Sequence, residues 1–200
     1  MDENTSGGKA FLNWLKAQAK GAMVEPPETI NQWKERRIEL KESLVRSFGG
    51  DEPSSGPPKV KACGELMGDG FKIEKLLIET RPHVEMTANL YIPEGANEEK
   101  KAPAILGVHG HWPQGKIAER IQYRCIGLAK LGYVVLMVDA FGSGERSIHI
   151  KENNYHGGLV GASLWPVGAR LLGLQVYDNM RAIDYLITRP EVDPQRIGCT

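Results

Sequence analysis

Apolar side chains near the start of the chain recur at helical spacing, and breaks in the pattern divide them into two predicted helices. The first helix carries a short apolar patch at Phe11–Leu15 and ends before the Pro26-Pro27 pair. The second begins at Thr29, which stands three residues before Gln32 as in a capping box. Its stripe, with one polar interruption, consists of Ile30, Trp33, Arg37, Leu40 and Leu44. We expect these helices to form an arm that packs on the main body, because their apolar faces need cover.

The hydrophobic period becomes alternating after a linker at residues 51–58, which is rich in Pro, Ser and Gly. Residues 59–67, 70–80 and 83–93 are then predicted to be strands joined by short turns. In the last of these strands one face is apolar and consists of Val84, Met86, Ala88, Leu90 and Ile92. The alternation predicts an antiparallel meander with one face on a core and the other in water.

From about residue 103 onward, short continuous apolar runs alternate with helical patterns, which is typical of parallel strands buried on both faces. The expected strands cover 103–109, 133–139 and 196–200, with helices over 117–131 and 172–188, an irregular segment over 140–165 and a turn at Asp193-Pro194. The predicted fold class is therefore α/β, with a helical arm and linker at 1–58 and a sheet domain at 59–200. Because a parallel strand at Thr200 leaves the sheet unfinished, we expect the chain to be the first part of a larger domain.

Composition and charge narrow the classes of function. The 200 residues are 41% hydrophobic and 25% charged, and 25 basic residues balance 25 acidic ones. A chain without net charge offers no field to hold a polyanion, so we expect no nucleic-acid partner. No apolar run is long enough to cross a bilayer and no export signal is visible, so we expect no membrane partner and favour the cytoplasm. Cys63, Cys125 and Cys199 form no paired motif and are expected to be free, buried thiols.

The strongest local candidate for chemistry is His109-Gly110-His111-Trp112, at the end of the first predicted parallel strand. Functional groups collect at the carboxyl ends of strands in doubly wound sheets. Gly110 permits a sharp turn, after which backbone N–H groups can point into a cleft and stabilise an oxyanion. A plain turn that ends the strand is the alternative for these residues.

A second candidate, Asp139–Arg146, follows the next parallel strand. It fails as a dinucleotide fingerprint, whose third glycine would fall at Ser147. It also fails as a nucleophile elbow, because Ser143 lacks the flanking glycines, and Ser163 has one of them but lies in the irregular segment. Neither serine is expected to be a nucleophile. We expect backbone hydrogen bonds to hold the segment in a tight turn, with Arg146 paired to a carboxylate.

Four motifs in order resemble an α/β-hydrolase: His-Gly-His after one strand, Asp-x-x-Gly-x-Gly-Glu after the next, the helix 174–186, and the segment 189–200. The resemblance covers about residue 60 to Thr200 and is greatest to the acetyl xylan esterase and dienelactone hydrolase branch, which also resembles prolyl-oligopeptidase-type peptidases. It implies the N-terminal half of a doubly wound α/β-hydrolase sheet, with antiparallel first strands.

This resemblance implies a serine hydrolase, most simply a carboxylesterase acting on an acetyl ester of a carbohydrate or on another small-molecule ester, with no cofactor and no metal. The backbone N–H of His111 would be one oxyanion donor, and Asp139–Gly144 would shape the cleft. In such enzymes the strand that ends here at Thr200 leads into the nucleophile elbow, and the acid and the histidine base follow. The nucleophile, acid and base would then lie beyond Thr200, and the 200-residue chain alone would be inactive.

Other hypotheses remain open from the sequence alone. A peptidase of the prolyl-oligopeptidase type would have the same fold. A metal-dependent hydrolase could bind an ion through His109 and His111, with His149 and His156 in the irregular segment, but it would need a barrel, against which the meander argues. A non-catalytic binding module also fits the chain taken by itself. A charged row at helical spacing is expected to face solvent and consists of Asp178, Arg181 and Asp184.

Overall fold

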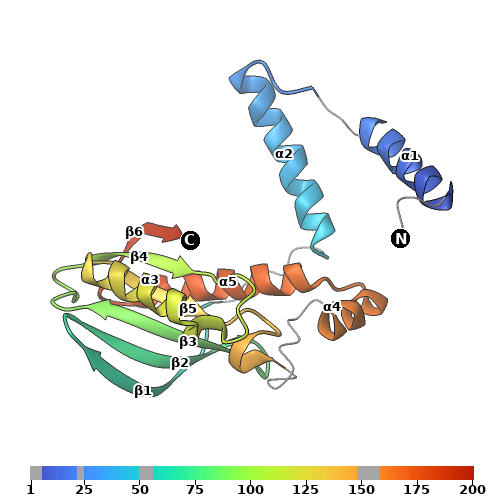
Figure 1. Cartoon of the computed structure of the whole chain (residues 1–200). Helices are drawn as coiled ribbons and strands as arrows, with labels where there is room; N and C mark the ends of the chain where they lie inside the picture. The colour runs from blue at the N-terminus through green and yellow to red at the C-terminus, as the bar shows by residue number, and fades with distance from the viewer. Residues whose placement is uncertain (1–5, 22–24, 50–55, 148–157) are drawn as a thin grey trace. The chain divides into compact units, whose positions relative to one another are not determined.

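The computed structural model describes residues 6–21, 25–49, 56–147 and 158–200, and contacts divide the chain into two units, Met1–Ser43 and Leu44–Thr200. The helices are α1 (Ser6–Gly21), α2 (Ile30–Ser47), α3 (Glu119–Lys130), α4 (Leu159–Leu164) and α5 (Leu171–Thr188) (Figure 1). The strands are β1 (Val60–Gly68), β2 (Phe71–Arg81), β3 (Val84–Pro93), β4 (Ala102–Gly107), β5 (Val134–Val138) and β6 (Val192–Cys199). In these ranges no helix has both the length and the apolar character that crossing a bilayer requires.

The first unit contains α1 and most of α2, and the predicted start of α2 is confirmed. The Gln32 N–H donates to Thr29 Oγ1 at 3.2 Å, and Gln32 Oε1 accepts the Thr29 N–H at 3.1 Å. These reciprocal bonds satisfy amide groups that the start of a helix leaves without partners. The apolar side chains of the α2 stripe are exposed, Ile30 at 69% and Trp33 at 45%. That the arm packs on the main body stays a prediction.

The second unit is built on one six-stranded sheet with the order β1-β2-β3-β5-β4-β6. β1, β2 and β3 form the predicted antiparallel meander, and β3 pairs with β5 in antiparallel fashion. β5, β4 and β6 are parallel to one another. The sheet is therefore mixed, and the predicted α/β class is confirmed.

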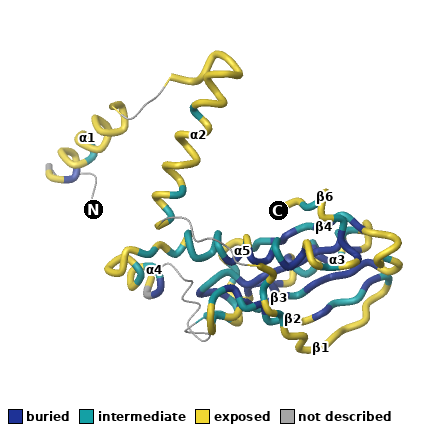
Figure 2. The backbone as a smooth tube through the Cα atoms, turned by 180° about the vertical axis from the view of Figure 1, so that it is seen from behind, coloured by how far each residue is buried: buried dark blue, intermediate teal, exposed yellow. Residues whose placement is uncertain are grey.

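Helices cover both faces of the middle of this sheet, where the strands are largely dark blue in Figure 2, whereas the edge strand β1 is mostly exposed. On one face, Ala182 and Leu186 of α5 are fully buried in the same core as Leu136. On the other face, Ile121 and Cys125 of α3 pack in a second core with Met137. All five residues of β5 are buried, because successive side chains point to opposite faces and both faces are covered.

The outer face of the meander differs from its prediction, which placed that face in water. Phe71 and Tyr91 lie on it with ring centroids 6.3 Å apart, and both belong to the core that includes α3 residues. The reason is the strand order: β3 pairs with β5 and is an interior strand, so α3 covers part of it. The alternating pattern of β3 cannot show that its outer face is covered, because the covering helix, α3, comes later in the sequence.

The last strand and the cysteines also differ from their predictions. Among the described strands, β6 pairs with β4 alone, so Gly198, Cys199 and Thr200 are exposed instead of buried. The predicted turn at Asp193-Pro194 lies inside β6, where the register against β4 shifts and Asp193 Oδ1 accepts the Gln195 N–H at 3.0 Å. Cys125 is buried as predicted. Cys63 and Cys199 are exposed, because each lies on an edge strand.

A charged cluster joins the end of α5 to β2. Glu74 accepts from Lys72 Nζ at 2.7 Å and from Arg189 Nη1 at 3.0 Å, and Arg189 Nη2 also pairs with Glu191 at 2.6 Å. Burial acts to raise the pKa of the Glu74 carboxyl, but the hydrogen bond from Lys72 and the charge of Arg189 outweigh burial and lower that pKa. The cluster therefore stabilises the ionised form of Glu74.

Candidate active site

Two loops that follow neighbouring parallel strands form the candidate active site. One runs from Val108 to Ile117 after β4, and the other from Asp139 to Ser147 after β5. The end of β6 lies beside the first loop, since the Val108 N–H donates to Thr200 O at 2.8 Å and the Thr200 N–H donates to Leu106 O at 3.1 Å. The carboxyl ends of β4, β5 and β6 therefore meet at one edge of the sheet, where active sites of doubly wound folds lie.

The first loop turns sharply at the four residues that the sequence singled out. The Trp112 N–H donates to Gly110 O at 2.8 Å, which makes His111 the central residue of a three-residue turn. The Gly115 N–H then donates to Trp112 O at 2.8 Å. The Arg120 guanidinium lies 5.1 Å from the centroid of the Trp112 ring. The structure thus places His111, which is exposed, at the tip of a tight turn beside the ends of the strands.

His109 is held inside the protein. Its side chain is fully buried, its Nδ1 lies 2.8 Å from Gly110 O, and its Nε2 accepts the Ala140 N–H at 3.3 Å. Because Nε2 accepts this bond, the ring proton lies on Nδ1 and is donated to Gly110 O. Both ring nitrogens are therefore used to shape the turn and to join the two loops.

A metal-dependent site does not fit these contacts. A histidine ligand needs a free lone pair, and the Ala140 N–H occupies the one on His109 Nε2. Among the residues that the structure describes, no three His, Cys, Asp or Glu side chains converge as a metal site needs. The open sheet also differs from the barrel that this alternative requires. His149 and His156 lie outside the described residues.

Asp139, the first residue of the second loop, is buried and binds groups from two other segments. Its Oδ1 accepts the Lys116 N–H at 2.8 Å, and its Oδ2 accepts Lys116 Nζ at 2.5 Å and Thr87 Oγ1 at 2.7 Å. The predicted backbone bonds of the loop are present, from the Ser143 N–H to Ala140 O at 2.9 Å among them. Sequence reasoning missed Lys116 and Thr87, which carry no motif of their own.

Arg146 pairs with a carboxylate as predicted, but this carboxylate belongs to a residue that was expected in solvent. Asp178 accepts from Arg146 Nη1 and from Arg81 Nη1, both at 2.7 Å, and its side chain is 2% exposed. Arg181 is buried too, with Nη1 at 2.6 Å from Asp184 Oδ2. The predicted solvated face is therefore wrong for Asp178 and Arg181, because α5 lies against the sheet. There Asp178 meets β2 and the second loop, and Arg181 Nη2 donates to Gly56 O at 2.8 Å.

Neither serine considered as a nucleophile has a base beside it in the described part of the chain. The Ser143 Oγ is buried and makes no hydrogen bond with the described residues. The Ser163 Oγ donates to Val160 O at 3.0 Å within α4. An activated serine needs a base within hydrogen-bond reach, and these contacts do not provide one.

A cavity of about 220 Å³ opens between the two loops and the first half of α5. Its polar groups include Gln175, whose Nε2 donates to Phe141 O at 3.2 Å, and Asn179. Its apolar walls consist of Met86, Val108, Val138, Phe141, Leu172 and Val176. These residues come from four separate parts of the chain, so no local pattern in the sequence could have indicated the cavity.

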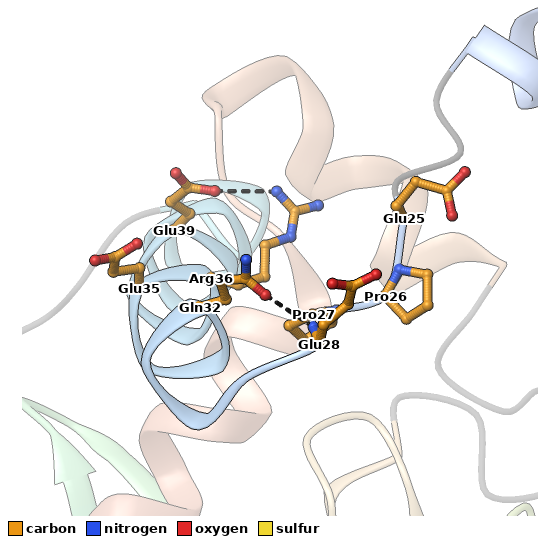
Figure 3. A pocket seen from close by; sticks show the side chains of 8 residues that line it. All are labelled: Glu25, Pro26, Pro27, Glu28, Gln32, Glu35, Arg36 and Glu39. Atoms are coloured by element: carbon orange, nitrogen blue, oxygen red, sulfur yellow. Dashed lines mark hydrogen bonds and ion pairs between the residues drawn. The ribbon is translucent and has the colours of Figure 1, made fainter.

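A second hollow, of about 380 Å³, lies in the helical arm at the start of α2 (Figure 3). Its polar groups pair locally: Arg36 Nη1 donates to Glu39 Oε2 at 3.0 Å, and Gln32 Oε1 accepts the Glu28 N–H at 2.9 Å. These bonds cap the helix or form an exposed ion pair. The residues of this hollow do not form an arrangement that acyl transfer needs. The edge of the sheet is therefore the better candidate for the active site.

Comparison with known proteins agrees with this fold. The chain is 29% identical over 173 residues to YtaP of Bacillus subtilis (strain 168), which is assigned as a hydrolase, and the match covers 81% of this chain and 54% of that protein. A protein of Bacteroides fragilis NCTC 9343 assigned as an acetyl xylan esterase superposes with a TM-score of 0.71 at 21% identity, over 84% of this chain and 47% of that one. Methylesterase BT1017 superposes with a TM-score of 0.65 at 21% identity, over 96% of this chain and 38% of that one. No family model matches the chain.

These similarities, together with the strand order, show the α/β-hydrolase fold that the sequence motifs implied. The chain spans about half the length of the relatives that it matches.

Proposed function

We propose that this chain forms the oxyanion side of a serine carboxylesterase that acts on acetyl esters of carbohydrates. The observation that carries the proposal is the tight turn centred on His111, at the carboxyl end of β4 and beside the end of β6. Structures with this fold include proteins named as acetyl xylan esterases and a methylesterase, which supports an ester as substrate in preference to a peptide.

The His111 N–H would serve as one of two oxyanion donors. When a nucleophile adds to an ester carbonyl, negative charge develops on the carbonyl oxygen, and a fixed backbone dipole stabilises that charge without having to reorganise. The second donor would be the N–H of the residue after the nucleophile. The pairing of Val108 with Thr200 supports this arrangement, since residues that follow Thr200 along the strand would reach the turn.

The nucleophile would be a serine in a longer protein, because the matches cover only 54% and 47% of the two relatives. The serine Oγ would bond to the ester carbon while a histidine takes its proton, and the alcohol would then leave with that proton. A water would attack the acyl-enzyme in the same way and release the acid. In this scheme residues 59–200 form the first part of the catalytic domain, residues 1–58 form its arm, and no cofactor or metal takes part.

Two substitutions at His111 test the proposed donor in the longer protein. His111→Pro removes the backbone N–H, and His111 is not among the non-glycine residues with the positive φ that proline cannot adopt. His111→Ala retains the N–H and is the matched control. Loss of one oxyanion donor should lower kcat by about 10²–10³-fold in the proline variant, while the alanine variant stays close to wild type. Equal losses in both variants would show that the side chain acts instead of the N–H.

The 200-residue chain provides a second test. Without the elbow serine it should neither hydrolyse p-nitrophenyl acetate nor react with a fluorophosphonate probe. Stoichiometric labelling of Ser143 or Ser163 would overturn the proposed place of the nucleophile.

A further inference from the structure

We infer that Lys116 and Asp139 are positioning residues: their buried ion pair fixes the turn centred on His111. We call Lys116 and Asp139, together with Thr87, Gly115 and Gly144 around the carboxylate, the latch. The inference rests on the proposed function for its catalytic meaning, whereas the placement of the turn can be tested by itself. Both residues would act through the backbone that joins them to His111.

The first observation is the number of donors on one carboxylate. Asp139 accepts both the backbone N–H of Lys116 at 2.8 Å and its Nζ at 2.5 Å. It also accepts Thr87 Oγ1 at 2.7 Å and the Glu145 N–H at 3.3 Å. Because Thr87 lies on β3 and Lys116 in the first loop, this carboxylate joins three segments at the edge of the sheet.

The second observation is the burial of the charges. The side chains of Lys116 and Asp139 are 3% and 0% exposed, while Glu145, which also pairs with Lys116, is 63% exposed. A buried ion pair often stabilises a protein no more than apolar residues of the same volume would, because both charges lose their hydration. The pair instead fixes the position of the first loop relative to the second, since charge-assisted bonds hold their partners at fixed distances and angles.

The third observation is that two glycines enclose the carboxylate. Gly115 and Gly144 have φ values of +58° and +54°. A Cβ added at Gly115 would lie 2.2 Å from Asp139 Oδ1, and one added at Gly144 would lie 2.3 Å from the same atom. The two loops thus approach the carboxylate so closely that a side chain at either position would displace it.

The path from the latch to the turn is short. Lys116 follows Gly115, whose N–H donates to Trp112 O at 2.8 Å. At the other end of the turn, His109 Nε2 accepts the N–H of Ala140, the residue directly after Asp139. Residues 139 and 140 therefore hold the first loop on both sides of His111. A change in the latch should move the N–H of the turn and leave the strands in place.

The first test compares two glycine variants in the 200-residue chain. Gly144→Ala places a methyl group against Asp139. Gly132→Ala carries the same kind of backbone strain, with φ +91°, but has no atom within 4 Å of the added Cβ. Hydrogen exchange of residues 110–116 should be faster in Gly144→Ala than in Gly132→Ala by about tenfold or more, while amides of β5 exchange alike in both. Equal exchange of residues 110–116 in the two variants would overturn the inference.

The second test removes the charge. Lys116→Met should speed exchange of residues 110–116 in the same way, whereas Lys130→Met should not, because Lys130 forms an exposed pair with Asp69 at 2.7 Å. If Lys116→Met does not fold, Thr87→Val deletes one 2.7 Å bond to the carboxylate and should show the same local effect, smaller in size. A rise in exchange that is uniform over the whole second unit would show a role in stability alone and would also overturn the inference.

Kinetics of the longer protein link the latch to catalysis. A misplaced oxyanion donor should lower kcat by up to about 10²-fold and leave KM nearly unchanged in Lys116→Met, with Lys130→Met close to wild type. A loss confined to KM would contradict the positioning role. If the longer protein has no esterase activity, the proposed function fails, and the exchange measurements still decide whether the latch fixes the turn.

Discussion

Replacing Asp178 by asparagine should strongly destabilise the second unit, because it removes the negative charge that two arginines share. The carboxylate accepts one bond from Arg81 and one from Arg146, both of 2.7 Å, and is 2% exposed. Removing one partner from a buried ion pair costs about 3–5 kcal/mol. Arg81 is 17% exposed and also stacks over Tyr177 at 4.2 Å, so we expect the lower end of this range, about 3 kcal/mol.

Urea unfolding followed by circular dichroism measures this loss, and Asp184→Asn on the same helix is the matched control. The Asp184 side chain is 30% exposed, and its partner Arg181 keeps a bond from Nη2 to Gly56 O at 2.8 Å. The control should therefore lose less than Asp178→Asn, because Asp184 is partly exposed and Arg181 keeps a hydrogen bond. A double-mutant cycle of Asp178→Asn with Arg146→Met should give a coupling energy of about 1–3 kcal/mol. If the two asparagine variants were equally stable, the argument from burial would be refuted.

Three further predictions follow from burial and charge. Burial raises the pKa of the Cys125 thiol to about 11. A thiol reagent at pH 8 should therefore label Cys63 and Cys199 in the folded protein, and Cys125 only in urea. Labelling of all three cysteines without urea would contradict this prediction. Glu74→Gln should lower the free energy of unfolding at neutral pH. The pKa of Glu74 is lowered in the folded state, so its stabilisation is present above the unfolded value near 4.5 and is lost as the pH falls through the folded value. Urea unfolding at several pH values should show the two proteins converging at acid pH, and a constant difference would refute the linkage. Ile187 is 50% exposed on α5, so Ile187→Lys should change the free energy of unfolding by no more than about 1 kcal/mol in urea unfolding, and a larger loss would contradict this exposure.

The elements of this fold could be predicted because their signals are local. The capping box that begins α2 lies within four residues, and both of its hydrogen bonds are present. The alternation along β3 and the continuous apolar run of β5 also reflect neighbours one or two positions apart, and both strands form where expected. Gly132, with φ +91°, follows α3 at the expected left-handed cap.

Part of the candidate site could be predicted for the same reason. The turn at Gly110–Trp112 follows a strand that the sequence pattern identifies, and the order of motifs indicated the α/β-hydrolase fold. The pairing of Arg146 with a carboxylate was also expected, although its partner was not. What was predictable in the site is therefore its backbone and its place at the end of β4.

The tertiary structure alone decided which polar side chains are buried and with whom they pair. Asp178 lies on a helix whose charged row looked solvated, and its partner Arg81 is 97 positions away in the sequence. Lys116 and Asp139 are 23 positions apart, and Thr87 is 52 positions from the same carboxylate. A periodic pattern records which positions share a face of one element, but the burial of a charge depends on which other elements cover that face. Those elements are brought together only when the chain folds, and so neither the latch nor the pairing of Asp178 with Arg81 and Arg146 could be predicted from the sequence pattern.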